Sequence, residues 1–364
     1  GKTRRQRQMC IRDRLFTMVC FVRANTLLPP SDFLGYKLGD KFTPHHLVVD
    51  YLFHVSQNEP NVKIVEYGKT YEGRPLMLAF ISSVDNMDKL EQIRKDNLTR
   101  AGIIKGSTKT KKVGIVWLSY NVHGNEANST EAAMKTLHAL ADKSNTNTQE
   151  WLKNTVVIID PSVNPDGRDR YANWYRMTAN RWPDADPLGR EHMEPWPGGR
   201  TNHYYFDLNR DWAWQTQIES QQRIIKYNEW LPHIHVDFHE QGYNSPYFFA
   251  PAAKPLHQYI TDWQRDFQKT IGLNHAKYFD RNNWLYFTKE SFDLLYPSYG
   301  DTYPTYNGAI GMTYEQAGHS RGGLAIETED GDTLTLADRL EHHYTTGLST
   351  CLLYTSDAAD ESCS

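Results

Sequence analysis

The stretch KKVGIVWLSYNVHGNEANSTEAAM, residues 111–134, contains the strand, the loop and the helix start that decide the fold. The run KKVGIVWLSY is apolar on both of its faces, as expected of a strand in a sheet that is covered by helices. A helix is predicted to begin near Asn128, with Glu131 as its capping-box partner three residues on. The loop between strand and helix carries His123 and Glu126, so both residues follow the end of a buried strand.

Strands and helices alternate on both sides of this stretch. Upstream, residues 43–58 predict a helix, and VKIVEYG and LMLAFISS predict two strands joined by KTYEGRP. Downstream, TVVIID at 155–160 predicts a second buried strand, which is closed by a turn at NPDG. The chain therefore begins as an alternating α/β protein.

The second half of the chain continues the pattern after a loop-rich insertion at about 180–205. A helix stopped by Pro232 is predicted next, followed by the strand HIHVDFHE. Apolar residues recur at helical spacing from Leu256 to Phe267, which predicts an amphipathic helix. GMTYE and LAIET predict late strands, and TLADRLEHHYTTGLS predicts a closing helix.

Helices that alternate with apolar strands indicate a three-layer α/β/α fold with a mixed, mostly parallel central sheet. Neither an internal repeat nor a low-complexity linker interrupts residues 30–350, so we expect one domain over 27–350. In sheets of this kind the reacting groups gather beyond the carboxyl ends of the strands. These strand ends are where candidate site residues are sought.

The composition limits the classes of function. With 364 residues, 39% of them hydrophobic, the chain is long enough to bury a large core. The formal net charge is −4 and the basic residues of KTRRQRQ stand at the N-terminus, so a mildly acidic body that does not bind nucleic acid is predicted. No apolar run reaches the length of a membrane span, so we expect no membrane-spanning segment. We also expect the protein to be a monomer.

Both ends of the chain differ from the body. Cys10, Cys20, Cys351 and Cys363 are the four cysteines, which excludes a disulfide or a thiolate zinc site within 21–350. Residues 1–26 and 351–364 lack periodicity and are interpreted as non-native flanking sequence. The apolar run at 15–26 matches the end of a signal peptide, which predicts a secreted or periplasmic protein; further spurious sequence is the equal alternative.

The pair His123 and Glu126 does not by itself indicate a metal site, because about one HxxE is expected by chance among 15 histidines. Its position is more informative. His239 closes the polar side of another predicted strand, and Glu315 stands at the end of GMTYE. Three strand ends thus bring residues able to bind or assist zinc to one rim. Two histidines, one carboxylate and an open fourth position are typical of a catalytic zinc.

Six motifs occur in order between about 43 and 349: YGKTYEGRPL, HGNE, NPDG, FDLNRDW, DFHEQG and TYEQAG. In this order they resemble the zinc carboxypeptidases of the carboxypeptidase A-like family. The resemblance implies one zinc ion per chain and the C-termini of peptides or proteins as substrates.

The resemblance also implies roles for residues. His123, Glu126 and His239 would hold zinc, and Glu315 would act as the general base on the water at the metal. His235 is the alternative to His239 as the third ligand. It stands four residues earlier on the same strand, which places it about 13 Å from the rim.

Substrate-binding and further catalytic residues follow from the same motifs. Asn209 and Arg210 would grip the free C-terminal carboxylate, which a guanidinium binds with two parallel hydrogen bonds. Arg176 would stabilise the oxyanion that forms on the carbonyl, with Arg170 and Arg181 as nearby alternatives.

Several positions bear on specificity. Tyr296 resembles a mobile tyrosine that closes over substrate, and Tyr299 competes for this role. Asn125 precedes Glu126 where digestive members have arginine, and the insertion at 180–205 is unlike theirs. Both would border the cleft. Gly300 falls at the position where relatives carry the residue that selects the substrate side chain. Because glycine has no charge, this position does not predict which substrate side chain is preferred.

The predicted function is that of a zinc metallocarboxypeptidase. One alternative is a zinc deacylase of the succinylglutamate desuccinylase or aspartoacylase kind, and another is a catalytically dead peptide-binding module. YEGRP and an aromatic-rich body favour the peptidase. The chain has no Gly-x-Ser-x-Gly elbow, and GKT at 68–70 lacks the upstream glycine of a phosphate loop.

Overall fold

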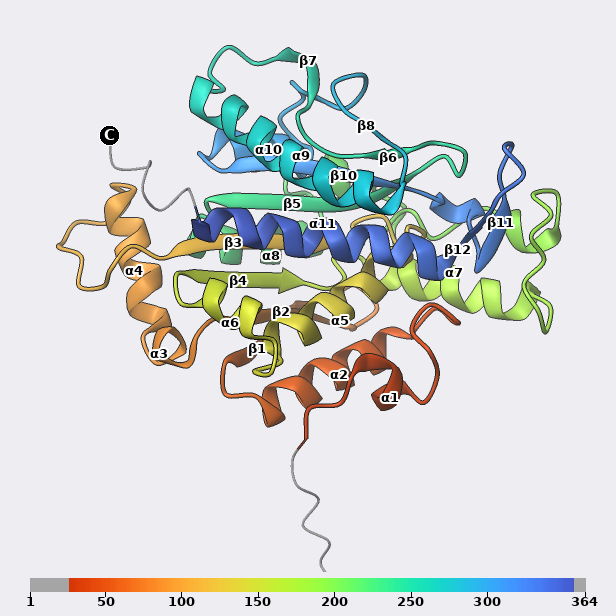
Figure 1. The fold of residues 1–364 in the computed structure, drawn as a ribbon, viewed down its shortest axis with the longest axis horizontal. Helices are drawn as coiled ribbons and strands as arrows, with labels where there is room; N and C mark the ends of the chain where they lie inside the picture. The colour runs from red at the N-terminus through yellow and green to blue at the C-terminus, as the bar shows by residue number, and fades with distance from the viewer. Residues whose placement is uncertain (1–25, 357–364) are drawn as a thin grey trace, which may run out of the picture.

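The computed structural model describes residues 26–356 and, within them, an eight-stranded sheet with helices on both faces (Figure 1). β3, β4, β5 and β10 run parallel at its centre, and β1 and β2 form an antiparallel hairpin on one side. In spatial order the strands are β1 (Val62–Lys69), β2 (Pro75–Ile81), β4 (Thr155–Asp160), β3 (Gly114–Tyr120), β5 (Ile234–Gln241), β10 (Ile310–Ala317), β6 (Tyr247–Phe248) and β8 (Tyr286–Phe287). The predicted three-layer α/β/α fold with a mixed, mostly parallel sheet is confirmed.

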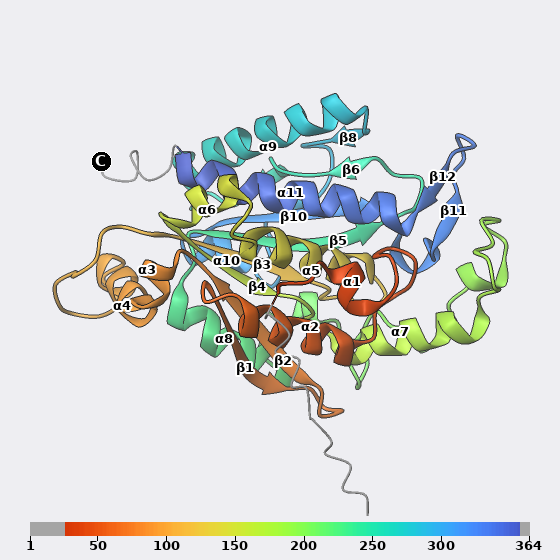
Figure 2. The same ribbon diagram turned by 60° about the horizontal axis from the view of Figure 1, so that its bottom comes forward.

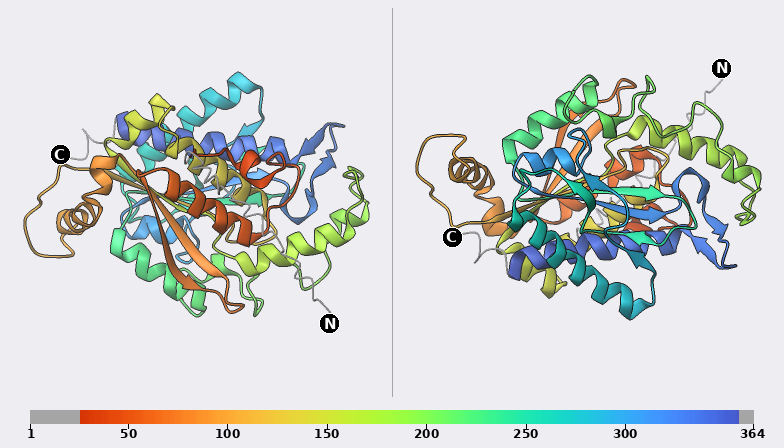
Figure 3. Two further views of the ribbon diagram at one scale, coloured as in Figure 1. Left: turned by 90° about the horizontal axis from the view of Figure 1, so that it is seen from below. Right: turned by 90° about the horizontal axis from the view of Figure 1, so that it is seen from above.

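Side chains alternate between the two faces of the sheet along each strand. The face that carries Leu118, Val236 and Met312 is named the apolar face, because its residues belong to one large hydrophobic core. It packs against helices far apart in the sequence: α2 (His45–Asn58), α5 (Asn128–Ala141), α9 (Asp262–Asn282) and α11 (Leu336–Ser356). Figures 2 and 3 show α11 and α8 (Ile218–Trp230) on opposite sides of the sheet.

The other face is named the polar face. Its amino-terminal half carries Ile115, Trp117 and Ile158, which form a second, smaller core with the helices of this side. These helices are α4 (Leu90–Arg100), α8 (Ile218–Trp230) and α10 (Thr302–Tyr306). Towards the carboxyl ends of the strands, this face carries Ser119, Asp237 and their polar neighbours instead.

Two predictions of local structure are wrong. The helix predicted from Leu256 begins at Asp262, because Thr261 caps it in a capping box with Gln264, and Leu256 ends the short strand β7 (Ala253–Leu256). The turn predicted at NPDG is the start of α7 (Pro165–Thr178), where the Asn164 side chain accepts a hydrogen bond from the backbone of Gly167.

Glu131 does not complete the predicted capping box on α5. It is fully buried and accepts hydrogen bonds from the backbone N–H and the hydroxyl of Thr43, both at 2.7 Å. Arg168 of α7 pairs with it at 2.6 Å. A charge network between helices therefore replaces the local contact that the spacing predicted.

The closing helix extends beyond the boundary that was drawn at residue 350. α11 runs to Ser356, and Cys351 is buried in the large core with an exposure of 1%. Residues 1–25 and 357–364, with most of the predicted flanks and the apolar run at 15–26, lie outside the described residues. Within the described part, none of the helices combines the length and the apolar character that crossing a bilayer requires.

Candidate metal centre

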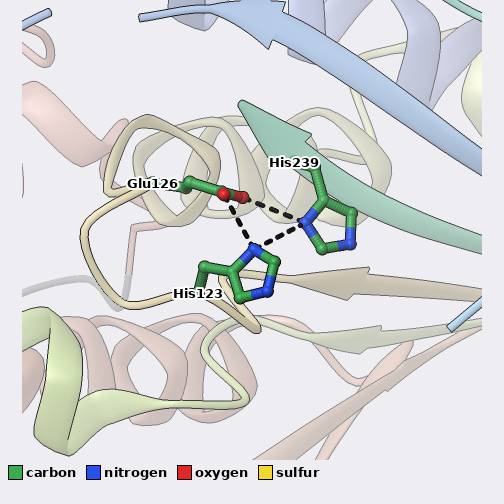
Figure 4. A group of neighbouring side chains, drawn as sticks. All are labelled: His123, Glu126 and His239. Carbon is green, nitrogen blue, oxygen red and sulfur yellow. Dashed lines mark hydrogen bonds and ion pairs between the residues drawn. The ribbon is translucent and has the colours of Figure 1, made fainter. Parts of the chain in front are cut away.

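His123, Glu126 and His239 come together at the carboxyl edge of the sheet (Figure 4). Nδ1 of His123 lies 2.7 Å from Oε1 of Glu126, and Nδ1 of His239 lies 2.9 Å from Oε2 of the same carboxylate. The two Nδ1 atoms are 3.2 Å apart, and one potential ligand atom from each residue lies within 4.8 Å of the others. All three side chains are buried, so this donor set is shielded from bulk water.

The loop that carries two of these residues is shaped by Asn121, which follows β3. Its backbone adopts φ +61°, a left-handed conformation that asparagine tolerates better than most residues. Its side-chain amide donates to the carbonyl oxygens of His123, Gly124 and Glu126 at 2.9 to 3.2 Å. Gly124 has no room for a side chain, because a Cβ there would lie 2.2 Å from the backbone of Arg168. The sequence reasoning missed Asn121.

Both histidines are held from behind by a carboxylate. Nε2 of His123 lies 3.0 Å from Oδ1 of Asp207, and Nε2 of His239 lies 2.9 Å from Oδ2 of Asp237. The hydrogen bond from Nε2 of His123 to Asp207 keeps the proton on that nitrogen, which leaves the lone pair of Nδ1 for a metal, and at His239 the amide of Asn209 also lies 3.2 Å from Nε2. The donor set and these supporting carboxylates therefore fit a catalytic zinc ion.

The charges of the site also suit a cation. Burial by itself would raise the pKa of Glu126, yet His123 and His239 hold this pKa well below its usual range. Glu126 is thus ionised, as a carboxylate ligand must be.

Glu315 faces the same cavity from the neighbouring strand. It stands opposite His239 in the parallel register of β5 and β10, and both residues line a cavity of about 370 Å³. Burial raises the pKa of Glu315 to about 8, and the carboxylates of Glu126 and Asp237 act in the same direction. A divalent cation at the donor set would lower this pKa again. Glu315 is not part of the ligand cluster, so it is free to act on a proton.

Asn209 and Arg210 line this cavity as well. Oδ1 of Asn209 accepts the backbone N–H of Gly300 at 2.7 Å, and the guanidinium of Arg210 lies 4.5 Å from the centre of the Tyr299 ring. The Arg210 side chain is 45% exposed, and its Nη1 donates to the carbonyl oxygen of Asn209 at 3.3 Å and lies 3.8 Å from Oδ2 of Asp207, so an anionic ligand can still reach the guanidinium from solvent.

The structure does not bring Arg176 to the cavity, contrary to the prediction. This residue is exposed in the last turn of α7. Arg170 donates to backbone carbonyls of the insertion, and Arg181 lies over the exposed ring of Trp182.

Arg200 lines the cavity instead. Its Nη1 lies 3.3 Å from Oε1 of Glu126, and its Nη2 lies 3.1 Å from Oδ2 of Asp207. The sequence reasoning missed Arg200 because the insertion at 180–205 was read only as a border of the cleft. The arginine in GGRTNH was the available signal, eight residues before Leu208.

Tyr296 does not line the cavity, whereas Tyr299 does. The hydroxyl of Tyr296 accepts a hydrogen bond from Nε1 of Trp214 at 2.9 Å, and its ring packs 4.8 Å from that of Tyr299. Gly300 is a packing residue: a Cβ there would lie 1.9 Å from Oδ2 of Asp237. Its small size is therefore needed beside the metal centre.

His235 lies in a different environment from the donor set. It is fully buried on the polar face among the rings of Trp117, Trp212 and Tyr227. The structure thus brings His239, and not His235, to the cluster with His123 and Glu126.

The fold and this site define a class of α/β proteins with a His–Glu–His candidate metal site at the carboxyl edge of a mostly parallel sheet. A sequence model described as zinc carboxypeptidase matches residues 48–275, and the chain belongs to the zinc carboxypeptidase family. No curated protein matches the chain.

Solved structures are similar in fold. Carboxypeptidase A from Helicoverpa armigera is 17% identical, with 91% of this chain and 80% of that chain covered and a TM-score of 0.59. A metallo-carboxypeptidase from Burkholderia cenocepacia is 16% identical, with 86% and 68% covered and a TM-score of 0.55. One from Pseudomonas aeruginosa is 12% identical, with 85% and 68% covered and a TM-score of 0.56.

Proposed function

We propose that the protein is a zinc-dependent carboxypeptidase that hydrolyses the C-terminal peptide bond of peptides or proteins. The observation that carries the proposal is the convergence of His123 and Glu126, from the loop after β3, with His239 of β5, while Glu315 faces them as a carboxylate outside the ligand set. The family provides the class of reaction, and the cavity provides residues for each step.

His123, Glu126 and His239 would hold the ion. When bound, zinc supplies a Lewis acid that polarises the scissile carbonyl and lowers the pKa of water. Glu315 takes the proton from the attacking water and passes it to the leaving amine.

Two arginines complete the assignment. Arg200 stabilises the negative charge that develops on the carbonyl oxygen, the role expected of Arg176 from the sequence. Arg210, with Asn209 beside it, binds the terminal carboxylate of the substrate.

The insertion supports a peptide substrate. Tyr204, Tyr205 and Phe206 follow Arg200 closely and are each more than half exposed. Buried Asn202 accepts the backbone N–H groups of Tyr204 and Phe206, and Tyr205 between them has φ +65°. A left-handed conformation costs a non-glycine residue about 1 kcal/mol. Exposed aromatic groups on a loop that begins with Arg200, which lines the cavity, suit an extended substrate with apolar side chains.

The test combines metal analysis with a substrate panel. We expect about one zinc per chain, hydrolysis of N-blocked peptides with a free C-terminus, and no hydrolysis of the same peptides with an amidated C-terminus. Removal of zinc by a chelator should abolish turnover, and added zinc should restore it. Activity that survives complete metal removal would contradict the mechanism.

The panel also separates the alternatives. Cleavage of N-acyl glutamate or aspartate without cleavage of blocked peptides would indicate the deacylase. Binding of peptides without any turnover would indicate the inactive module. A monomeric state, a secreted or periplasmic location and the domain limits at the termini stay predictions from the sequence.

A further inference from the structure

A row of polar side chains crosses the polar face directly below the metal centre. Asp160, Ser119, Asp237 and Thr313 occupy matching positions on four adjacent strands, β4, β3, β5 and β10. All four are buried, and the first three have no exposed surface. A polar row in the middle of a covered sheet needs hydrogen-bond partners from the layer above it.

α8 brings a buried arginine to this layer. Arg223 is 1% exposed, and none of its three guanidinium nitrogen atoms has a hydrogen-bond acceptor in the described part of the protein. Its guanidinium lies 4.0 Å from the centre of the Trp212 ring. Arg168, which is equally buried, instead bonds to Glu131 and to two backbone carbonyls. A buried guanidinium without acceptors is strongly unfavourable.

Several polar atoms of this face of the sheet and of α8 also lack partners in the part of the chain that the structure describes. They are buried and lack a hydrogen-bond partner among the described residues: Oγ of Ser119, Oδ1 of Asp160, Oγ of Ser220 and both ring nitrogens of His235. Donors and acceptors that are close to one another but not in contact are commonly joined by ordered water, which makes about three hydrogen bonds in such places.

Trp212 brings Arg223 towards the row, because the guanidinium lies 4.0 Å from the centre of its ring and the same ring lies 5.2 Å from that of His235, two residues before Asp237. Burial raises the pKa of Asp160 to about 7, and Arg223 is the first group that opposes this rise, ahead of the hydrogen bond from Tyr67. The two side chains nevertheless form no direct hydrogen bond. Water between them would satisfy both.

The row is connected to the candidate metal ligand. Asp237 lies between Ser119 and Thr313 in the row, and its Oδ2 contacts Nε2 of His239 at 2.9 Å. Gly300 closes this point from above without leaving space for a side chain. The groups around Asp237 therefore fix the position of its carboxylate, and this carboxylate in turn orients the ring of His239.

We propose that ordered water joins Arg223 of α8 to Asp160, Ser119 and Asp237, and that this hydrated network positions His239 for the metal. Arg223 is then a positioning residue that acts on the metal through Asp237. The inference rests on the proposed function, since it concerns affinity for the zinc ion of that site.

The test is the zinc affinity of the intact protein, measured by competition with a chromophoric chelator, which does not depend on turnover. We expect Asp237→Asn to weaken zinc binding by about tenfold to a hundredfold, the range seen when a partner of a metal-binding histidine is removed. Arg223→Met and Asp160→Asn should weaken it by about tenfold, near the lower end of that range.

The matched control acts on the same helix but away from the row. Nδ2 of Asn97 donates to the carbonyl oxygens of Trp230 and Leu231, at 2.8 and 3.0 Å, where α8 ends. Asn97→Leu should lower the stability of the fold and leave zinc affinity unchanged. If Arg223→Met lowers stability in the same way without changing the affinity, its role is only structural and the inference is overturned.

Two further measurements keep the outcome decisive. Should Arg223→Met fail to fold, Arg223→Lys and Ser119→Ala change the network with less disturbance, and unchanged affinity in both would overturn the inference. A crystal structure at a resolution that shows ordered water should place water between Arg223 and Asp160, and a dry direct contact there would refute that part. A wild-type protein that binds no zinc would instead refute the proposed function itself.

Discussion

The two faces of the central sheet are built from the same strands and differ by a shift of one residue. Leu118, Val236 and Met312 point into the large hydrophobic core. Ser119 and Asp237, their immediate neighbours, point the other way into a polar layer below the metal centre. The apolar face is therefore part of the large core, whereas the polar face combines a smaller core with a polar layer at the carboxyl ends of its strands, because successive side chains of a strand project to opposite sides.

The largest expected effect of a substitution is on catalysis and comes from the polar face. Glu315→Gln should lower kcat/KM for blocked peptides by about 10²- to 10⁴-fold, the contribution typical of a general base. Zinc content and thermal stability should stay as in the wild type, because Glu315 is not a ligand. Turnover that survives the substitution would place the base elsewhere.

The matching substitution on the apolar face should do the opposite. Leu118→Ala leaves a cavity in the large core and should lower the free energy of unfolding by about 2 to 5 kcal/mol. Chemical denaturation measures this loss. Zinc affinity should not change, and Ser119→Ala next to it should have a much smaller effect on stability. A large loss of zinc affinity in Leu118→Ala would show that the two faces are not separable.

Arg210 tests the part of the cavity that lies beyond the sheet. Arg210→Met should raise KM for substrates with a free terminal carboxylate and cost about 1.5 to 3 kcal/mol in kcat/KM, the usual value of hydrogen bonds to a charged group. Arg176→Met is the matched control, since this exposed arginine does not line the cavity. Equal losses in the two variants would refute the assignment of the carboxylate site.

The smallest expected effect is a displaced pH profile. Glu315 must be deprotonated to act as a base, so kcat/KM should fall as the pH falls through its pKa. Burial raises this pKa from the ordinary value of 4.5 to about 8 before a cation lowers it. The acid limb should therefore lie between these two values when kcat/KM is measured against pH. A limb at or below 4.5 would mean that burial does not control this group.

Much of the fold was predictable from local patterns. Apolar runs such as TVVIID and the run at 111–120 correspond to β4 and β3, because strands buried on both faces leave a continuous apolar signature. Two failures came from local helix caps, at Thr261 and Asn164, and a third came from a long-range contact that replaced a local one. Glu131 has the spacing of a capping box, yet Arg168 and Thr43 bind it across the fold.

The site followed the same division. The strand-end positions of His123, Glu126, His239 and Glu315 predict a shared rim, and the structure brings them to one cavity. The resemblance implied Arg176 and Tyr296, whereas the cavity contains Arg200 and Tyr299. Irregular loops have no periodicity from which the direction of a side chain can be read.

The sequence by itself determined the alternation of strands and helices, the two faces of each strand and the donor types at the strand ends. Those features depend on the spacing of residues along the chain, which the periods of helix and strand convert into direction. Only the tertiary structure decided that Asn121 shapes the ligand loop, that Arg200 reaches Glu126, and that Arg223 is buried against Trp212. These contacts join residues far apart in sequence, and their geometry depends on how the layers pack together.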